Sequence, residues 1–196
     1  FADQNTQADP GQVPEGFINL AEKTDLSPKF NPSTTHSVQG KDGLFYIYTS
    51  GTTGLPKAVI FTNGRWTLAY GTYGHVLNLN KDDVMYCTLP LYHATGMVVC
   101  WCGVIAGSST LAIRRKFSTS SFWKDVQKFD ASAIGYVGEL CRYLMDAPPS
   151  ELEKGHRVTK MIGNGMRPNI WDKFKSRFGI QEVLELYASS EGNVGF

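Results

Sequence analysis

From residue 44 onward, short runs of β-branched and aromatic residues alternate with segments long enough to form helices. This alternation constrains the fold more than any other feature, because strands and helices that alternate along a chain are typical of α/β layering. The predicted fold class is therefore α/β, a layered sheet with flanking helices. We expect strands at residues 44–48, 84–89, 109–113, 133–137, 160–162 and 183–186, and helices at residues 63–76, 95–106, 118–129, 139–146 and 168–178.

Residues 1–43 differ in composition from the rest of the chain, since they are rich in Gln, Asn, Pro, Ser and Thr and lack a sustained strand or helix period. We predict an extended lead-in segment over residues 1–43 and a partial domain over residues 44–196. The first residues lack the basic start and apolar middle of a secretory signal, and they lack Met. We expect a fragment of a longer protein.

Charge and cysteine usage narrow the function classes. Lys and Arg number 19 against 18 Asp and Glu, and this balance lacks the basic excess of a nucleic-acid-binding protein, so we exclude nucleic acid as a partner. The cysteines stand among apolar residues, and their spacing fits neither a zinc site nor a redox motif. We expect Cys87, Cys100, Cys102 and Cys141 to be buried, reduced thiols, and the compartment to be reducing.

The predicted strand at residues 44–48 runs into Thr-Ser-Gly-Thr-Thr-Gly-Leu-Pro-Lys at residues 49–57, which we place directly ahead of a helical segment. Glycines allow close backbone approach, consecutive N–H groups form an anion-binding nest, hydroxyls donate to phosphoryl oxygens, and lysine supplies charge. The Gly-Lys-Ser/Thr order of a Walker A loop is missing. Composition alone leaves a flexible polar turn as the alternative. The candidate phosphate-binding residues are Thr49, Ser50, Gly51, Thr52, Thr53, Gly54 and Lys57.

Read together, Tyr-Ile-Tyr at residues 46–48 and the loop after it resemble the signature loop of the acyl-adenylate-forming superfamily. This superfamily includes acyl-CoA synthetases, luciferases and the adenylation domains of peptide synthetases. The resemblance implies the fold of the large N-terminal domain of these enzymes, and it implies that the loop binds the phosphates of ATP.

Residues 89–93, Leu-Pro-Leu-Tyr-His, resemble the superfamily segment that lies beside the acyl substrate. A single histidine near apolar residues reads, without that context, as a hydrogen-bonded structural residue. The resemblance implies instead that His93 lies beside the carboxylate and the acyl phosphate. A general base is not required there, because adenylation uses a carboxylate that is already ionised.

Two later segments resemble the nucleotide-binding elements of the superfamily. Gly163, Asn164 and Gly165 resemble the turn on which adenine rests, although a Gly-x-Gly alone also serves turn geometry. Residues 187–191, Tyr-Ala-Ser-Ser-Glu, resemble the Tyr-Gly-x-Thr-Glu element, with Ala188 in place of Gly and Ser190 in place of Thr. The resemblance implies that Tyr187 stacks on adenine, that Ser190 keeps a hydroxyl for the α-phosphate, and that Glu191, with Thr49, holds Mg²⁺.

The intervening sequence narrows the resemblance to one branch. Residues 114–118, 136–144 and 170–174 resemble the fatty-acid transport protein and very-long-chain acyl-CoA synthetase branch. The basic residues 114–116 also fit solvated charge at a strand end, with contact to CoA phosphates or anionic lipid as the alternative. We assign Trp66, Tyr70, Tyr73 and Trp123 to the core and none of them to an acyl tunnel.

The implied function is a fatty acid–CoA ligase that uses ATP, Mg²⁺ and CoA, with Lys57, His93 and Glu191 as catalytic candidates. The resemblance implies the cytoplasm or the cytoplasmic face of a membrane, with peripheral membrane association of the whole protein. The ribose-binding Asp and the small C-terminal domain of the superfamily have no counterpart here, so we expect this fragment to be inactive alone. Fatty-acid uptake with incidental catalysis, and a generic nucleotide-binding module, remain the alternatives.

Overall fold

The computed structural model describes residues 13, 16–49 and 54–190. The chain forms two compact units, residues 1–38 and residues 39–196. In the first unit, a short helix α1 (Leu20–Asp25) precedes a 3-10 helix (Ser33–Ser37). The predicted loop or extended lead-in therefore contains two short helices that the prediction lacked. In α1 the Thr24 hydroxyl donates to the Leu20 carbonyl at 2.7 Å, a local hydrogen bond that pairs a polar side chain within the helix.

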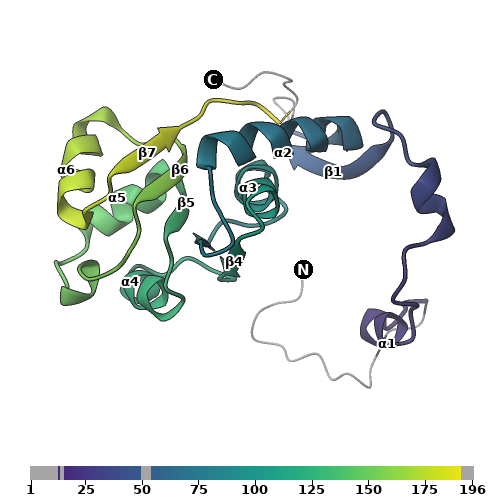
Figure 1. Ribbon diagram of the computed structural model, residues 1–196, viewed down its shortest axis with the longest axis horizontal. Helices are drawn as coiled ribbons and strands as arrows, with labels where there is room; N and C mark the ends of the chain where they lie inside the picture. The colour runs from purple at the N-terminus through teal and green to yellow at the C-terminus, as the bar shows by residue number, and fades with distance from the viewer. Residues whose placement is uncertain (1–12, 14–15, 50–53, 191–196) are drawn as a thin grey trace. The chain divides into compact units, whose positions relative to one another are not determined.

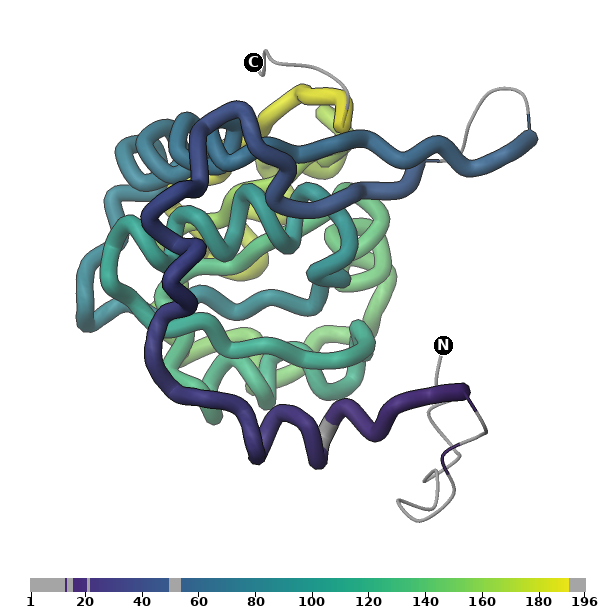
Figure 2. The backbone as a smooth tube through the Cα atoms, turned by 90° about the vertical axis from the view of Figure 1, so that its right-hand side faces the viewer, coloured from purple at the N-terminus to yellow at the C-terminus, as the bar shows by residue number. Residues whose placement is uncertain are grey.

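The second unit begins with a hairpin that we predicted only in part. Strand β1 (Gly43–Thr49) matches the expected strand, but it pairs antiparallel with β2 (Lys57–Thr62) in a separate two-stranded sheet. Helix α2 (Asn63–Leu77) starts only after β2, so the predicted phosphate loop joins two strands instead of a strand and a helix. The sequence Lys-Ala-Val-Ile-Phe-Thr in β2 has the β-branched and aromatic content of a strand. Figure 2 shows the hairpin extending past the rest of the unit.

The remaining strands form one parallel sheet of order β4-β3-β5-β6-β7, as the α/β prediction requires (Figure 1). Its strands lie close to the predicted positions, and helices connect each strand to the next one along the chain. Their bounds are β3 (Val84–Cys87), β4 (Thr110–Ile113), β5 (Ala133–Val137), β6 (Lys160–Asn164) and β7 (Glu182–Glu185).

Successive side chains of the buried strands point to opposite faces and build two cores. In β3, Tyr86 packs with one core while Met85 and Cys87 pack with the other, and in β6 Met161 and Ile162 divide in the same way. The first core lies under α4 (Thr119–Lys128), α5 (Gly138–Asp146) and α6 (Pro168–Phe178), with a 3-10 helix (Glu151–Glu153) between α5 and α6. The second lies under the end of α2, a π-helix (Thr95–Trp101) and α3 (Cys102–Ala106). The helices cover both faces of the sheet.

The segment predicted as one helix over residues 95–106 is divided between the π-helix and α3. A π segment has a wider turn than an α-helix and is frequent at functional sites. Helix α2 packs beside α3 (Figure 1). The Lys160 ammonium donates to the Leu77 carbonyl at 2.7 Å, and this hydrogen bond connects the C-terminal end of α2 to the start of β6.

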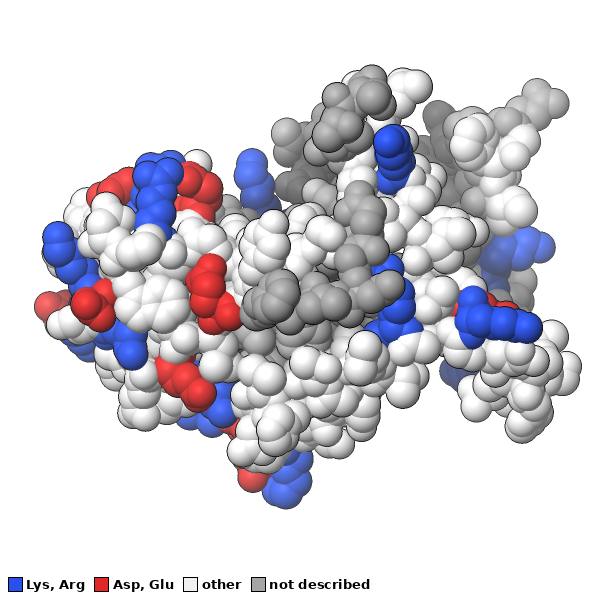
Figure 3. All heavy atoms as spheres, turned by 90° about the horizontal axis from the view of Figure 1, so that it is seen from above, with Lys and Arg blue, Asp and Glu red and all other residues white. Residues whose placement is uncertain are grey.

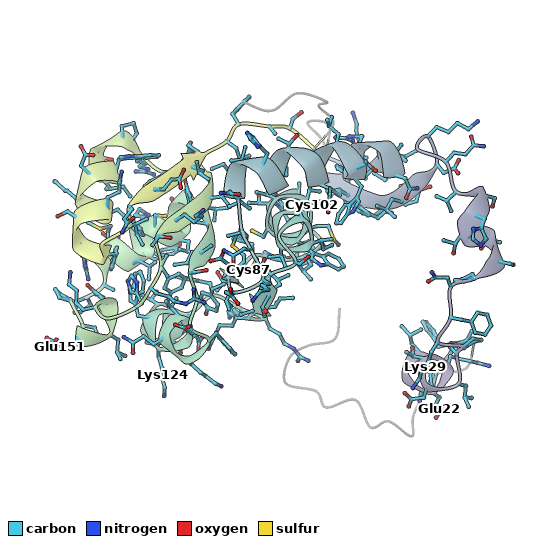
Figure 4. The ribbon with its side chains drawn as sticks, viewed as in Figure 1. Glu22, Lys29, Cys87, Cys102, Lys124 and Glu151 are labelled. Carbon is cyan, nitrogen blue, oxygen red and sulfur yellow. The ribbon has the colours of Figure 1, made fainter. Side chains whose placement is uncertain are left out.

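All four cysteines are free and buried, as predicted, and Figure 4 shows Cys87 and Cys102 among packed side chains. Pro168 opens α6, where its missing N–H leaves no hydrogen bond unmade. On the face drawn in Figure 3, acidic and basic side chains lie side by side at the end formed by α5 and α6. Two ion pairs of α5, Arg142–Glu139 and Arg142–Asp146, lie within that helix, and Arg177 of α6 pairs with the buried Glu153.

Candidate functional site

A cavity of about 1140 Å³ lies between α2, the π-helix, the carboxyl ends of β6 and β7, and residues 186–190. In parallel sheets, ligands bind beyond the carboxyl ends of the strands, which is where this cavity opens. Much of its lining is apolar and comes from Ala69, Val76, Val98, Val99, Ile162 and Leu186. Polar groups enter from the loops after the strands.

Four of the predicted site residues line this cavity together: His93, Asn164, Ala188 and Ser190. They come from three segments that are far apart in the sequence. The described lining does not include Thr49, Gly54, Lys57, Gly163, Gly165 or Tyr187. The predicted site residues therefore form two groups. One group lines the cavity, and the other lies on the hairpin, at the glycines of the turn after β6, or at Tyr187.

His93 is exposed, and its Nδ1 accepts the backbone N–H of Thr95 at 3.3 Å. Because Nδ1 is an acceptor, the neutral imidazole carries its proton on Nε2. The buried Thr95 hydroxyl donates in turn to the Asn164 side-chain oxygen at 3.4 Å. A short chain of contacts thus joins His93 to the end of β6.

The turn after β6 is built by close backbone approach. A Cβ at Gly163 would overlap the Tyr136 carbonyl, and a Cβ at Gly138 would overlap the Gly165 carbonyl. Gly165 has φ +81°, a left-handed conformation that favours glycine. At Gly138 the reason is that the turns after β5 and β6 touch through their main chains, whereas Gly163 lies within β6 directly beside Tyr136 of β5.

Glu185, at the end of β7, holds this turn in place. Its carboxylate accepts the N–H of Gly165, and its other oxygen accepts the Tyr136 hydroxyl at 2.5 Å. Burial raises the pKa of Tyr136 well above its usual range, and the hydrogen bond to Glu185 raises it further. Tyr136 therefore stays a neutral donor throughout the physiological pH range.

A side chain of α2 binds the segment that follows β7. The Arg65 guanidinium donates to the Ser190 carbonyl at 3.0 Å, and its carbon lies 4.3 Å from the centre of the Phe61 ring. Tyr187, predicted to stack on adenine, has 75% of its surface exposed. Arg65 also lines the cavity.

The candidate phosphate loop is described only at its two ends. Thr49 is the last residue of β1 and lies opposite Lys57, the first residue of β2. Gly54 adopts φ +91°, which suits the predicted role of glycine in this loop. The predicted residues Ser50, Gly51, Thr52 and Thr53, and the metal ligand Glu191, lie outside the described residues.

Within the described part of the chain, no group of three His, Cys, Asp or Glu side chains could hold a metal ion. Thr49, predicted as a magnesium ligand, carries a hydroxyl oxygen, and oxygen is the donor type that suits this hard cation. Over residues 16–49 and 54–190, no helix is long and apolar enough to cross a membrane.

Sequence reasoning missed three residues that organise the site: Arg65, Thr95 and Glu185. Arg65 carried a usable signal, because it is the one Lys, Arg, Asp or Glu in the sequence of α2. Glu185 carried another, because it stands between apolar neighbours just ahead of the predicted Tyr187 segment. Thr95 gave no signal, since its partner Asn164 is 69 residues away.

The structure also bears on the predictions for the basic residues 114–116 and for the aromatic residues assigned to the core. Arg114 forms an ion pair with Asp125 and donates to the Lys116 carbonyl at 3.0 Å, which accounts for one residue of the basic trio without a ligand. Trp123 is buried in the first core as expected. Tyr73 packs with the second core and with a further cluster that includes Phe61 and Val98, and it also lines the cavity. Burial raises the pKa of Tyr73, so it too remains neutral.

The sequence of this chain is similar to those of known proteins. Residues 3–196 match the family model described as AMP-binding enzyme. The chain is 46% identical over 171 residues to the medium/long-chain-fatty-acid–CoA ligase FadD6 of Mycobacterium tuberculosis, covering 87% of this chain and 29% of the relative. It is 41% identical over 192 residues to the human long-chain fatty acid transport protein 6, covering 94% and 30%. The chain spans less than a third of either relative.

Among solved structures, the fold resembles the inhibitor-bound N-terminal domain of FACL13 from Mycobacterium tuberculosis, with a TM-score of 0.76. The two sequences are 23% identical, and the match covers 89% of this chain and 44% of the other. This likeness confirms the predicted fold class, a parallel sheet flanked by helices.

Proposed function

This chain belongs to the AMP-binding enzyme family, and we propose on that premise that the whole protein is a fatty acid–CoA ligase of the long-chain or very-long-chain class. The names of both relatives support a fatty-acid substrate. The observation that carries the proposal is the cavity, in which apolar residues of α2 and the π-helix line the same space as His93, Asn164 and Ser190. A fatty acid needs both kinds of surface, because its tail is apolar and its head is charged.

The size of the cavity supports a ligand larger than a single small molecule. Pockets for drug-sized ligands hold about 300–1,000 Å³, and this cavity has about 1140 Å³. A nucleotide and an acyl chain that meet at the carboxyl ends of β6 and β7 would fill such a space. The proposed reaction requires this meeting.

The proposed reaction has two steps. A fatty carboxylate attacks the α-phosphorus of ATP, which forms acyl-AMP and releases pyrophosphate. The thiolate of CoA then attacks the acyl carbon, which forms the thioester and releases AMP. Neither step needs a protein nucleophile, so the protein contributes position and charge stabilisation.

The residues divide this work. Residues 49–54 and Lys57 bind the phosphates, Gly163 to Gly165 and Tyr187 bind adenine, and Ser190 donates to the α-phosphate. His93 lies on the acyl side, where its Nε2–H can donate to an oxygen of the carboxylate. Mg²⁺ would be held by Glu191 and Thr49, and it would neutralise phosphate charge.

A matched pair of variants on α2 tests the acyl cavity. Thr72 lines the cavity, whereas Thr67 on the same helix does not. In the whole protein, we expect Thr72→Phe to shift acyl-CoA formation toward shorter fatty acids, because the ring occupies cavity volume. Thr67→Phe should keep the chain-length profile of the wild type. Identical profiles for all three proteins would contradict an acyl cavity at this position.

One relative named as a transport protein favours a second candidate, fatty-acid uptake in which catalysis is incidental. Cellular import of a labelled fatty acid that survives Glu191→Ala would support this role. Import that falls together with acyl-CoA formation would support the ligase. A generic nucleotide-binding module would bind ATP without response to any fatty acid.

We further propose that the whole protein acts in the cytoplasm or at the cytoplasmic face of a membrane, with peripheral attachment. The isolated 196-residue chain, which spans less than a third of either relative, should have weak nucleotide affinity and no appreciable ligase activity. Robust acyl-CoA formation by the isolated chain would overturn this expectation.

A further inference from the structure

Arg65 joins two parts of the candidate site that the sequence separates by 125 residues. It lies in the first turn of α2, directly after the strand that leaves the candidate phosphate loop. Its backbone N–H donates to the Thr62 hydroxyl at 3.3 Å, which caps the helix and anchors the residue. The base of the side chain is therefore fixed.

The guanidinium contacts two parts of the described structure. Toward the hairpin, one nitrogen donates to the Ile60 carbonyl at 3.4 Å, and the group lies over the Phe61 ring at 4.3 Å. Toward the segment after β7, another nitrogen donates to the Ser190 carbonyl at 3.0 Å. A planar fork with five N–H donors can serve two carbonyls and stack on a ring at once, whereas a lysine ammonium is a compact point charge without this planar geometry.

We propose that Arg65 is a positioning residue, which sets the distance between the phosphate-binding hairpin and the Tyr187–Ser190 segment. The inference rests on the proposed function, because it assumes that both parts contact one nucleotide. Strand β2 leads from the candidate phosphate loop into α2, and Ser190 ends the segment predicted to bind adenine and the α-phosphate. A nucleotide that spans both parts requires a fixed separation between them, and the Arg65 side chain links the two parts.

The expected effect is on nucleotide binding more than on the chemical step. A hydrogen bond from a charged group contributes about 1.5–3 kcal/mol, which corresponds to about a tenfold to a hundredfold change in an equilibrium constant. When the link is lost, the residues that bind phosphate and those that bind adenine are still present, but the distance between them is no longer fixed. We expect the KM for ATP to rise by about that factor while the KM for the fatty acid stays within about twofold.

The test uses Arg65→Met and Arg65→Lys in the whole protein, with Arg142→Met as the matched control. Arg142 also lies over an aromatic ring, Tyr143 at 4.5 Å, but its ion pairs stay within α5. ATP–pyrophosphate exchange should give a raised KM for ATP in Arg65→Met, an intermediate KM in Arg65→Lys, and the wild-type KM in Arg142→Met. A wild-type KM in both Arg65 variants would overturn the inference, and Arg65→Lys alone decides if Arg65→Met does not fold.

A second measurement separates this inference from the ligase proposal. Hydrogen exchange of the peptide that contains Ser190 should be faster in Arg65→Met than in the wild type and unchanged in Arg142→Met. This comparison needs no activity. A wild-type protein without ATP–pyrophosphate exchange would contradict the proposed function, whereas unchanged hydrogen exchange in Arg65→Met would overturn the positioning role.

Discussion

The Tyr136 hydroxyl on β5 donates to the Glu185 carboxylate on β7 across the carboxyl end of β6, at a distance of 2.5 Å. The second oxygen of this carboxylate accepts the Gly165 N–H, so one side chain holds three neighbouring strand ends. The turn predicted to carry adenine is thus fixed by a side chain that also lines the cavity.

Replacing Tyr136 by Phe tests this clamp. The change removes the hydroxyl while it keeps the buried ring, and we expect a loss of about 1–2 kcal/mol in the free energy of unfolding. Tyr143→Phe is the control, because Tyr143 is 46% exposed. Urea denaturation measures both. Equal stability of Tyr136→Phe and the wild type would show that the Glu185 hydrogen bond contributes nothing.

Two glycines should respond in opposite directions to the same substitution. At Gly163 a Cβ would overlap the Tyr136 carbonyl, so Gly163→Ala should destabilise the protein by more than about 2 kcal/mol. At Gly71, inside α2, no heavy atom lies within 4 Å of a Cβ. There Gly71→Ala should stabilise by about 0.5–1 kcal/mol, since alanine favours the helix. Thermal denaturation distinguishes the two, and a stable Gly163→Ala would refute the close approach.

Stability should fall in acid through Glu153, whose residue surface is 4% exposed. The hydrogen bonds from Arg177 lower the pKa of this carboxyl, with distances of 2.7 and 2.9 Å. A carboxyl with a lowered folded-state pKa stabilises the protein above its unfolded pKa of about 4.3, and that stability is lost as the pH falls through the folded-state value. Glu153→Gln should reduce stability at pH 7 and flatten this acid dependence.

The control for that prediction is Glu139→Gln, which removes an exposed partner of Arg142. Exposed pairs contribute about 0.2–1 kcal/mol, so its unfolding profile from pH 7 to pH 3 should stay close to that of the wild type. An acid dependence in Glu153→Gln as steep as that of the wild type would exclude Glu153 as its source.

The thiols should resist alkylation until the protein unfolds. Burial raises the pKa of Cys102 and of Cys141 to about 12, and the thiolate is the reactive form. Iodoacetamide at pH 8 should leave these two cysteines unmodified in native protein and modify them in denaturant, as read by mass spectrometry. Rapid native labelling of either would contradict its burial.

Sequence pattern predicted the parallel sheet well because each buried strand carries its own apolar signal. It failed at the hairpin. Residues 57–62 have the residue types of a strand, but their pairing with Phe45 and Ile47 of β1 is not visible in the local pattern. The same limit applies to the site. His93, Asn164 and Ser190 followed from local motifs, whereas Arg65 and Thr95 act through partners far away in the sequence.

The central proposal, that the whole protein adenylates a fatty acid, is tested most directly by ATP–pyrophosphate exchange with fatty acids of graded length. We predict exchange that requires a fatty acid, that is lost in Glu191→Ala, and that persists in Glu182→Ala, a control at an exposed position on β7. Folded protein that binds ATP but shows no exchange with any fatty acid would contradict the proposal.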